Sequence, residues 1–258
     1  MRMIARTAVR MTVAVGLLVG GAATPALADA EAAALVRKAV DALPGVPFEA
    51  KITLTTADGS RYLELKQKKG SDGTRMGYLE VVGPQDLAGI RHLFIEPTNG
   101  DPPQQYLKLT ASRSIVRVSA DTREQPFLGS TFYIADLVEP PFDSYAYEFA
   151  GDVELLGRYC KLVEGTPKSP EDALYGKIVA AIDPKEQIVL RRQFYDAKGQ
   201  LLKTWQVEKL VKVQGLWTPL VQDMRNVQEN SESRLEITEI EYNADIADEV
   251  FTPAYLKR

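Results

Sequence analysis

The sequence predicts a mainly β protein built on one antiparallel sheet, with a single helix near its N-terminus. From Phe48 onward, apolar side chains recur at every second position in successive runs, the spacing that places them on one face of a strand. Charged residues such as Glu64 and Lys66 occupy alternate positions, as expected of a sheet with one face in water. Most breaks between runs carry turn residues, as in Asp58-Gly59, so roughly a dozen strands in meander order are expected.

The first 28 residues have the pattern of a cleavable secretory signal. Three arginines flank the start of an apolar run, and Ala26-Leu27-Ala28 provides a cleavage motif before Asp29. An uncleaved membrane anchor is the alternative, but the apolar run is short and rich in glycine for a spanning helix. We therefore expect a signal peptide at 1–28 and one exported domain at 29–258, with no integral membrane segment in the mature chain.

The predicted helix follows the cleavage point directly. Asp29 is placed to cap it, apolar residues recur at helical spacing from Leu35 to Leu43, and Pro44-Gly45 would end it.

Composition excludes several classes of partner and of stabilising bond. Without the signal the chain keeps 28 basic and 35 acidic residues, a formal net charge of −7, which disfavours nucleic acid and other polyanions. The single cysteine, Cys160, cannot form an internal disulfide and lies in an apolar alternating run. We expect it to be a small core residue.

A sheet this wide must curl or close, and its apolar concave face then needs a filling. That filling can be side chains, the N-terminal helix or a ligand. The alternation slips between Ile237 and Ile240, which predicts a bulge. The candidates for lining an apolar cavity are apolar members of the strand alternations, each equally suited to a plain core: Ile52, Leu54, Leu63, Leu65, Leu79, Val81, Trp205 and Val207.

The stretch 125–137 interrupts the strands and carries more apolar surface than a plain connection needs. Ser130 or Thr131 could cap a short helix there. Two interpretations stay open, a plug that closes the core and a lid at the mouth of a cavity. The residues that would form either element are Phe127, Leu128, Phe132, Ile134 and Leu137.

The sequence offers little for catalysis. His92 is the only histidine, so a catalytic triad or dyad could be built only around it, and a metal site would rely almost wholly on carboxylates. A surface or hydrogen-bonded structural histidine is the favoured interpretation. Since no glycine loop suited to phosphate is present either, we predict no enzyme activity, no cofactor and no metal.

Several short motifs spread over most of the mature chain carry a family resemblance. The most specific is Phe127-Leu128-Gly129-Ser130 followed by Asp136-Leu137. The sequence thereby resembles the outer membrane lipoprotein-sorting proteins, which are LolA-like relatives of the periplasmic lipoprotein carrier of Gram-negative bacteria. The further matching positions are Pro84, Gly89, Leu93, Gly199, Leu201, Lys203, Trp217-Thr218-Pro219, Met224 and Phe251-Thr252 through Leu256.

This resemblance implies an open, strongly curved antiparallel half-barrel with short helices covering its apolar concave face. It also implies a periplasmic carrier that binds acyl chains of a lipoprotein or another lipid for transfer towards the outer membrane. The implied partners are the lipid cargo, an inner-membrane transporter and an outer-membrane acceptor. The alternative is a periplasmic adaptor that docks on a lipid transporter of the resistance-nodulation-division type and carries no cargo itself.

Overall fold

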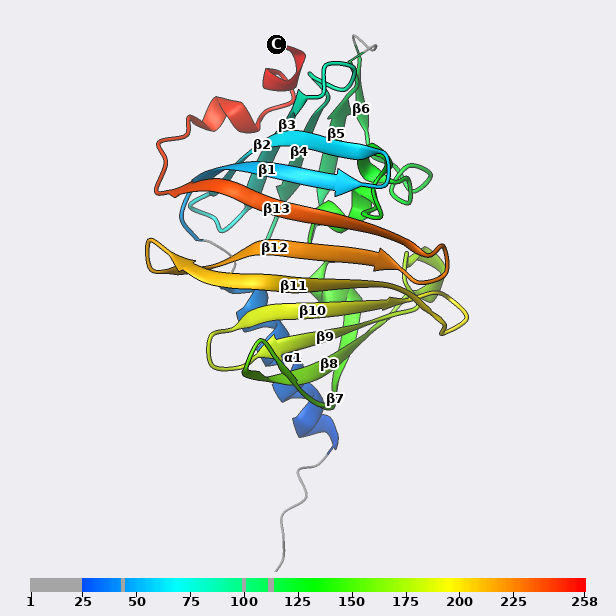
Figure 1. Cartoon of the computed structure of the whole chain (residues 1–258). Coiled ribbons are helices and arrows are strands. Elements are labelled where there is room, and N and C mark those ends of the chain that lie inside the picture. Colours follow the sequence, from blue (N-terminus) through cyan, green and yellow to red (C-terminus); the bar gives the residue numbers. More distant parts are fainter. Residues whose placement is uncertain (1–24, 43–44, 99–100, 111–113) are drawn as a thin grey trace, which may run out of the picture.

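The computed structural model describes residues 25–258 except 43–44, 99–100 and 111–113, so most of the predicted signal peptide lies outside the described residues. Within this part, one antiparallel sheet runs in the order β6-β5-β4-β3-β2-β1-β13-β12-β11-β10-β9-β8-β7 (Figure 1). The predicted mainly β class and the open, curved half-barrel are confirmed.

Two meanders make up the sheet, and they join where β1, the first strand of one, pairs with β13, the last strand of the other. The first meander contains β1 Phe48–Thr56, β2 Gly59–Lys69, β3 Arg75–Gly83, β4 Arg91–Glu96, β5 Gln104–Lys108 and β6 Ile115–Arg117. The second contains β7 Tyr145–Leu155, β8 Arg158–Pro167, β9 Lys177–Asp183, β10 Ile188–Tyr195, β11 Leu201–Val213, β12 Leu216–Asn226 and β13 Ser231–Tyr242. Because β6 and β7 are opposite edges of the sheet, the connection between them must cross the molecule. We call residues 118–144 the covering segment.

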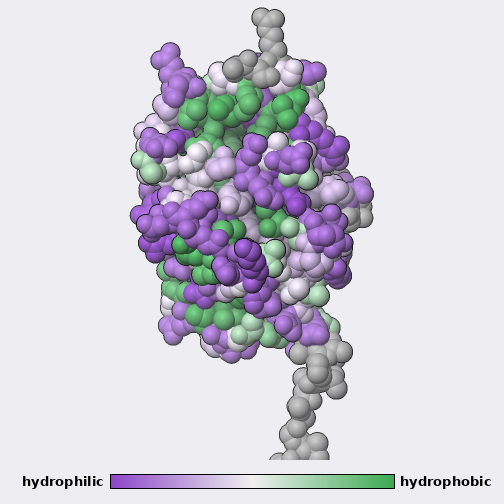
Figure 2. Space-filling model, turned by 90° about the vertical axis from the view of Figure 1, so that its right-hand side faces the viewer, coloured by the Kyte–Doolittle hydropathy of each residue, from purple (hydrophilic) through white to green (hydrophobic). Residues whose placement is uncertain are grey.

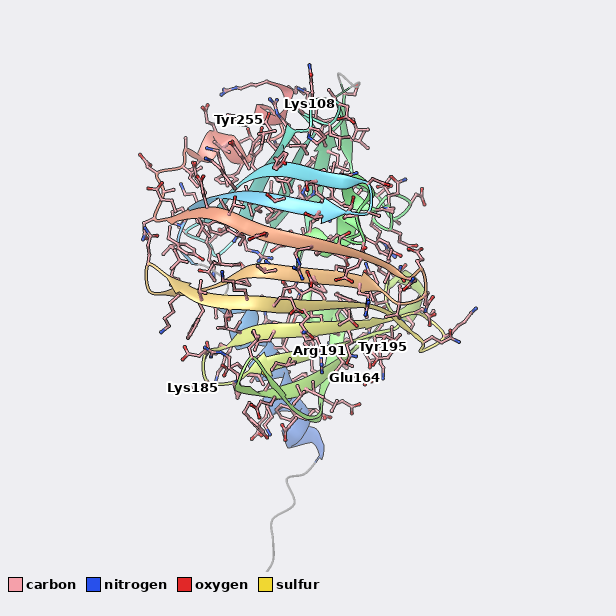
Figure 3. The ribbon with its side chains drawn as sticks, viewed as in Figure 1. Lys108, Glu164, Lys185, Arg191, Tyr195 and Tyr255 are labelled. Carbon is pink, nitrogen blue, oxygen red and sulfur yellow. The ribbon has the colours of Figure 1, made fainter. Side chains whose placement is uncertain are left out.

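Alternation along the strands explains why one face is buried. In β1, Phe48, Ala50, Ile52 and Leu54 are buried while intervening residues are partly or fully exposed. The covering segment and α1 (Pro25–Asp41) lie behind the sheet in Figure 1, against this apolar concave face. The opposite, convex face carries polar side chains. Figure 3 shows two of them, Glu164 and Tyr195, on the side facing the viewer.

The predicted bulge is confirmed. Strand β13 pairs with β1 in one register up to Lys51 with Glu239 and resumes one residue out of step at Ile52 with Ile237. The extra residue, Thr238, lets both stretches keep their apolar side chains on the concave face.

Helix α1 begins at Pro25, four residues before the predicted cap, so Asp29 lies inside the helix and not at its start. Ala32, Leu35 and Ala39, on one side of the helix, pack against Val163 of β8 and Ile182 of β9. The predicted apolar stripe is therefore the face that meets the sheet.

Short 3₁₀ helices, rather than α-helices, form the ordered parts of the covering segment. They are η1 Phe127–Gly129, η2 Ile134–Leu137 and η3 Phe142–Ser144. Neither Ser130 nor Thr131 caps the start of a helix, which corrects the expectation from the sequence; Ser130 lies at the C-terminal cap of η1, and Tyr133 precedes η2. The Ser130 hydroxyl instead accepts a hydrogen bond from the Phe132 N–H at 3.2 Å, and the Thr131 N–H donates to the Ser233 hydroxyl at 2.9 Å.

The C-terminal residues cover part of the convex face. Ile246, Val250, Phe251 and Leu256 pack on Tyr78 and Leu93, from strands β3 and β4. Two short helices belong to this part, η5 Asp248–Phe251 and η6 Tyr255–Lys257, and a further one, η4 Pro170–Asp172, precedes β9. The side of the molecule in Figure 2 is mostly hydrophilic, with apolar patches near its upper end and smaller ones in its lower half. Among the described residues, no helix has the length and apolar character needed to cross a membrane.

Candidate functional site

A cavity of about 740 Å³ lies beside the covering segment. Its walls come from the covering segment, from the residues before β5 and from the loop that joins β8 to β9. The volume falls within the range of about 300–1,000 Å³ that small-molecule sites usually have. This cavity is the candidate functional site.

The cavity lining combines apolar and charged side chains. Val118, Val138, Leu174 and Phe194 contribute apolar wall, and the ring of Tyr145 has an apolar body with a polar edge. The charged residues of the lining are Arg123, Asp136, Glu139, Asp143, Lys168, Asp172 and Arg192. A wall of this composition suits a ligand with both a hydrocarbon part and a polar part.

Glu139 connects the two halves of the sheet across the concave side. Its backbone N–H donates to Glu96 Oε1 at 2.9 Å, and Glu96 pairs with Arg75 on β3. Its carboxylate accepts from Arg192 Nη2, on β10, at 2.6 Å. Burial by itself raises the pKa of Glu139, but the two arginine cations outweigh burial and lower it. The carboxylate therefore stays ionised and holds the covering segment to β10, while the backbone N–H holds it to β4.

Asp136 holds the covering segment to β11 through a buried ion pair. Lys203 Nζ lies 2.5 Å from Asp136 Oδ2, and the side chains are 0% and 3% exposed. The other carboxylate oxygen accepts from the Tyr175 hydroxyl at 2.5 Å, and the Tyr133 N–H donates to Oδ2 at 2.7 Å. Burial lowers the pKa of Lys203, and the Asp136 charge opposes that shift. The ammonium also lies 3.4 Å from the centre of the Tyr133 ring, so its charge is balanced on two sides. We call Asp136 with Lys203 the latch.

A narrow apolar gap of about 60 Å³ adjoins the cavity between α1 and the sheet. Val36, Ala39 and Val40 of α1 form one wall, and Ile178 and Ile182 of β9 belong to the other. The gap and the cavity share lining residues, namely Glu139, Pro140, Tyr145 and Arg192. The two spaces are therefore neighbours, one mixed in polarity and one apolar.

The eight residues predicted as cavity candidates lie outside the lining of this cavity. Five of them, which are fully buried on the concave face against the covering segment, are Ile52, Leu54, Leu63, Leu79 and Val81. Leu65 and Trp205 are half-buried against the same cluster. Val207 is buried in a separate cluster with Cys160, Ala181 and Leu190. Their role in binding a ligand stays a prediction.

The five lid or plug candidates all pack on the centre of the concave face. Phe127, Phe132 and Ile134 are buried there, and Leu128 and Leu137 are half-buried against the same cluster. In this conformation they fill the middle of the hollow and leave the cavity to one side. Whether the segment moves aside for a ligand stays a prediction.

Sequence reasoning missed the cavity residues Arg123, Glu139, Tyr145 and Arg192. Period-two alternation indicates which strand residues share a face, but it carries no information about where a long connection crosses that face. One available signal was Pro140-Pro141, because adjacent prolines mark an extended, non-helical segment.

The groups that could serve catalysis are placed for structure. His92 is 1% exposed and its Nε2 lies 2.8 Å from Gln105 Oε1, and burial lowers the pKa of His92 to about 4. The predicted hydrogen bond is confirmed, and the alternative of a surface position is wrong, because the ring is buried. Cys160 is fully buried in the core as expected, and burial raises its pKa, which favours the thiol over the thiolate. In the described part of the chain, no three acidic, histidine or cysteine side chains are grouped to hold a metal ion.

Comparison with solved structures defines the class of protein first. The chain superimposes on a domain assigned to the outer membrane lipoprotein-sorting proteins, from Vibrio parahaemolyticus, with a TM-score of 0.81 and 22% identity over 89% of this chain and 100% of that one. A DUF1329 family protein from Desulfovibrio piger superimposes with a TM-score of 0.80 and 20% identity over 89% of this chain and 99% of that one. A LolA superfamily protein from Nitrosomonas europaea superimposes with a TM-score of 0.66 and 17% identity over 87% of this chain and 98% of that one. The resemblance seen in the sequence is thus confirmed in the fold, which is that of the lipoprotein-sorting and LolA superfamily proteins.

The family itself follows from the sequence. Residues 73–258 match a family model described as "-like: Uncharacterized protein", and the chain belongs to that family. No curated protein matches the sequence.

Proposed function

We propose that the protein is a periplasmic carrier that binds acyl chains of a lipoprotein or another lipid and moves them towards the outer membrane. The observation that carries the proposal is the cavity of about 740 Å³ on the apolar side of a curved sheet, beside a segment held to that sheet by the ion pairs of Asp136 with Lys203 and of Glu139 with Arg192. An inner-membrane transporter would load such a carrier, and an outer-membrane acceptor would unload it. Residues 1–28 would be removed during export.

The physical need for a carrier is large. Each methylene group buried is worth about 0.8 kcal/mol, so a sixteen-carbon chain exposed to water costs on the order of 10 kcal/mol. An apolar wall shields such a chain without directional bonds, and the fold supplies that wall. No catalysis is part of the proposal, because the only histidine is a buried hydrogen-bonded group and Cys160 is a buried thiol.

The alternative is an adaptor that docks on a lipid transporter and carries no cargo. One observation favours it: Phe127, Phe132 and Ile134 already fill the centre of the concave face. The two functions make opposite predictions about lipid content, because an adaptor needs no internal ligand.

The test is mass spectrometry of organic extracts from gently purified mature protein. We expect lipid in the wild-type extract. Less lipid is expected in Ala173→Trp, because Ala173 lines the cavity and an indole there occupies ligand volume. Ala247→Trp is the matched control, because Ala247 is exposed and lies outside that lining. Wild-type protein that contains no lipid, even after incubation with phospholipid vesicles, would exclude the carrier and leave the adaptor.

The lid role has its own test. Phe132 is 6% exposed and packs on the centre of the concave face. Replacing it by aspartate removes apolar contacts between the segment and the sheet, so we expect less lipid to be recovered from Phe132→Asp. The control is Val227→Asp, at a residue that is 43% exposed. Equal recovery from wild type and Phe132→Asp would argue against a lid.

A further inference from the structure

Arg123 is a cation of the cavity lining that forms no ion pair with another described residue. Arg123 lies in the covering segment and is half-buried, and its side chain lines the cavity. Its Nε is buried without a hydrogen-bond partner. A buried donor on a charged group is costly when it is unpaired, so an arginine in this state is suited to an acceptor from outside the chain.

The other cations of the lining have acceptors within the chain, although the acceptor of Lys168 is a neutral carbonyl that does not balance its charge. Arg192 is paired with Glu139 at 2.6 Å, and Lys168 Nζ donates to the Asp143 carbonyl at 2.9 Å. Of the carboxylates, Asp136 is bound in the latch and Asp143 pairs with Arg37 at 3.1 Å.

The remaining carboxylate of the lining, Asp172, is exposed, so water screens it. Among the described residues no carboxylate forms an ion pair with Arg123.

The position of Arg123 is fixed by its backbone. Its N–H donates to the Ser119 carbonyl at 3.0 Å, and its own carbonyl accepts from the Ala135 N–H at 3.0 Å. The second bond ties it to the start of η2, next to the latch. Burial raises the pKa of Tyr145, and the Arg123 cation opposes that shift, as expected of a guanidinium near the phenol across the cavity.

From this arrangement we propose that the cavity binds an amphiphile with an acidic head group, a carboxylate or a phosphate, and that Arg123 binds that head group. The inference rests on the proposed carrier function and narrows its cargo. The guanidinium presents planar, paired donors that match both kinds of oxyanion. The hydrocarbon tail extends along Val138 and Leu174 towards Tyr145 and Pro140, which also border the apolar gap under α1. Arg123 lines the cavity and not the gap, so head and tail have separate places.

The test compares two ligands that differ by one charge, cis-parinaric acid and its methyl ester, in fluorescence titrations of lipid-stripped protein. We expect the acid to bind about tenfold more tightly than the ester, a difference of about 1.4 kcal/mol at 25 °C. Arg123→Gln should bring the ratio close to one and leave the affinity for the ester unchanged. Arg123→Lys should keep most of the preference, because the charge remains.

The matched control is Arg117→Gln, which removes the same charge from an exposed residue of β6 outside the cavity lining. It should keep the wild-type ratio. Inorganic phosphate and butyrate are the competitors that distinguish a lipid head group from a free anion. Neither should displace the acid at concentrations at which palmitate does.

Each result decides something different. Equal affinity of wild type for acid and ester, or a preference that survives Arg123→Gln, would overturn the head-group site and leave the carrier intact. If phosphate displaced the acid as effectively as palmitate does, the proposal of an amphiphilic ligand would be overturned, because the hydrocarbon tail would then add nothing to the affinity. Failure of both ligands to bind would overturn the carrier proposal itself. The wild-type comparison requires no variant, so it holds even if Arg123→Gln folds poorly.

Discussion

Removing the charge of Lys203 should destabilise the protein severely. Its ammonium is completely buried, and it is 2.5 Å from Asp136, whose side chain is 3% exposed. Lys203→Met keeps most of the volume of the side chain but leaves a carboxylate inside the protein without its cation. Breaking a buried pair in this way costs about 3–5 kcal/mol. The Tyr175 hydroxyl and the Tyr133 N–H still donate to the carboxylate, so we expect the lower end of that range.

Urea unfolding measures this loss. With a slope of about 1–3 kcal/mol per molar urea, a loss of about 3 kcal/mol moves the midpoint down by about 1 M or more. The double variant Lys203→Met with Asp136→Asn should lose less than the sum of the two single variants, with a coupling of about 1–3 kcal/mol.

The control is Lys51→Met, in the exposed cross-strand pair of Lys51 with Glu239, which should leave the midpoint unchanged. A loss below about 1 kcal/mol in Lys203→Met would refute the reasoning, since the pair would then contribute no more than an exposed one.

Three further predictions follow from other buried groups. The pKa of His92 is about 4 in the folded protein and 6.5 in the unfolded chain. Between these pH values the unfolded chain binds a proton that the folded protein does not, so the free energy of unfolding falls as the pH falls. From pH 7 to pH 4, urea titrations should show His92→Gln losing about 3 kcal/mol less of this free energy than wild type. Gly77→Ala should lower stability by about 1–3 kcal/mol in thermal unfolding, because the added Cβ would lie 2.0 Å from the Phe94 ring, and Phe94→Ala should relieve most of that cost. Arg158→Ala should cost about 2 kcal/mol, because Arg158 Nη1 lies 2.7 Å from Asp183 Oδ2 and Asp183 is 4% exposed; a urea midpoint equal to that of wild type would contradict this.

The sheet could be predicted from the sequence because its determinants are local. Alternation is a property of a few consecutive residues, so it identified the buried face of strands such as β1, and a slip in the alternation located the bulge at Thr238. The start of α1 was predicted wrongly for a related reason. Two local start signals compete here, the cap residue Asp29 and Pro25, a residue type favoured at the first helical position, and the helix begins at the second.

The cavity and the latch could not be predicted in the same way. Lys203 shares its parity with Trp205, so the alternation already placed its side chain on the apolar face. The alternation does not show which residue forms the ion pair with Lys203. Asp136 lies 67 residues earlier in the chain, in a segment without periodicity, and only the path of that segment across the concave face brings the two charges together.

Under the carrier proposal, a lid formed by the covering segment and an acyl chain would compete for apolar surface of the sheet, and the free energies that each gains by burial are similar in size. Phe127, Phe132 and Ile134 are each buried against the sheet, and burying such a side chain is worth about 1.5–3 kcal/mol, or about 5–9 kcal/mol for the three. A sixteen-carbon chain gains on the order of 10 kcal/mol from the same kind of surface. Under the carrier proposal the exchange is therefore nearly balanced, which allows both loading and release. Apolar contacts alone would let the segment settle on the sheet in many positions. The latch makes one position of the segment specific, because Asp136 reaches Lys203 in only one of these positions. Under the carrier proposal the ion pair sets the position of the closed segment, and the free energy gained by burying hydrocarbon sets the population of the open state.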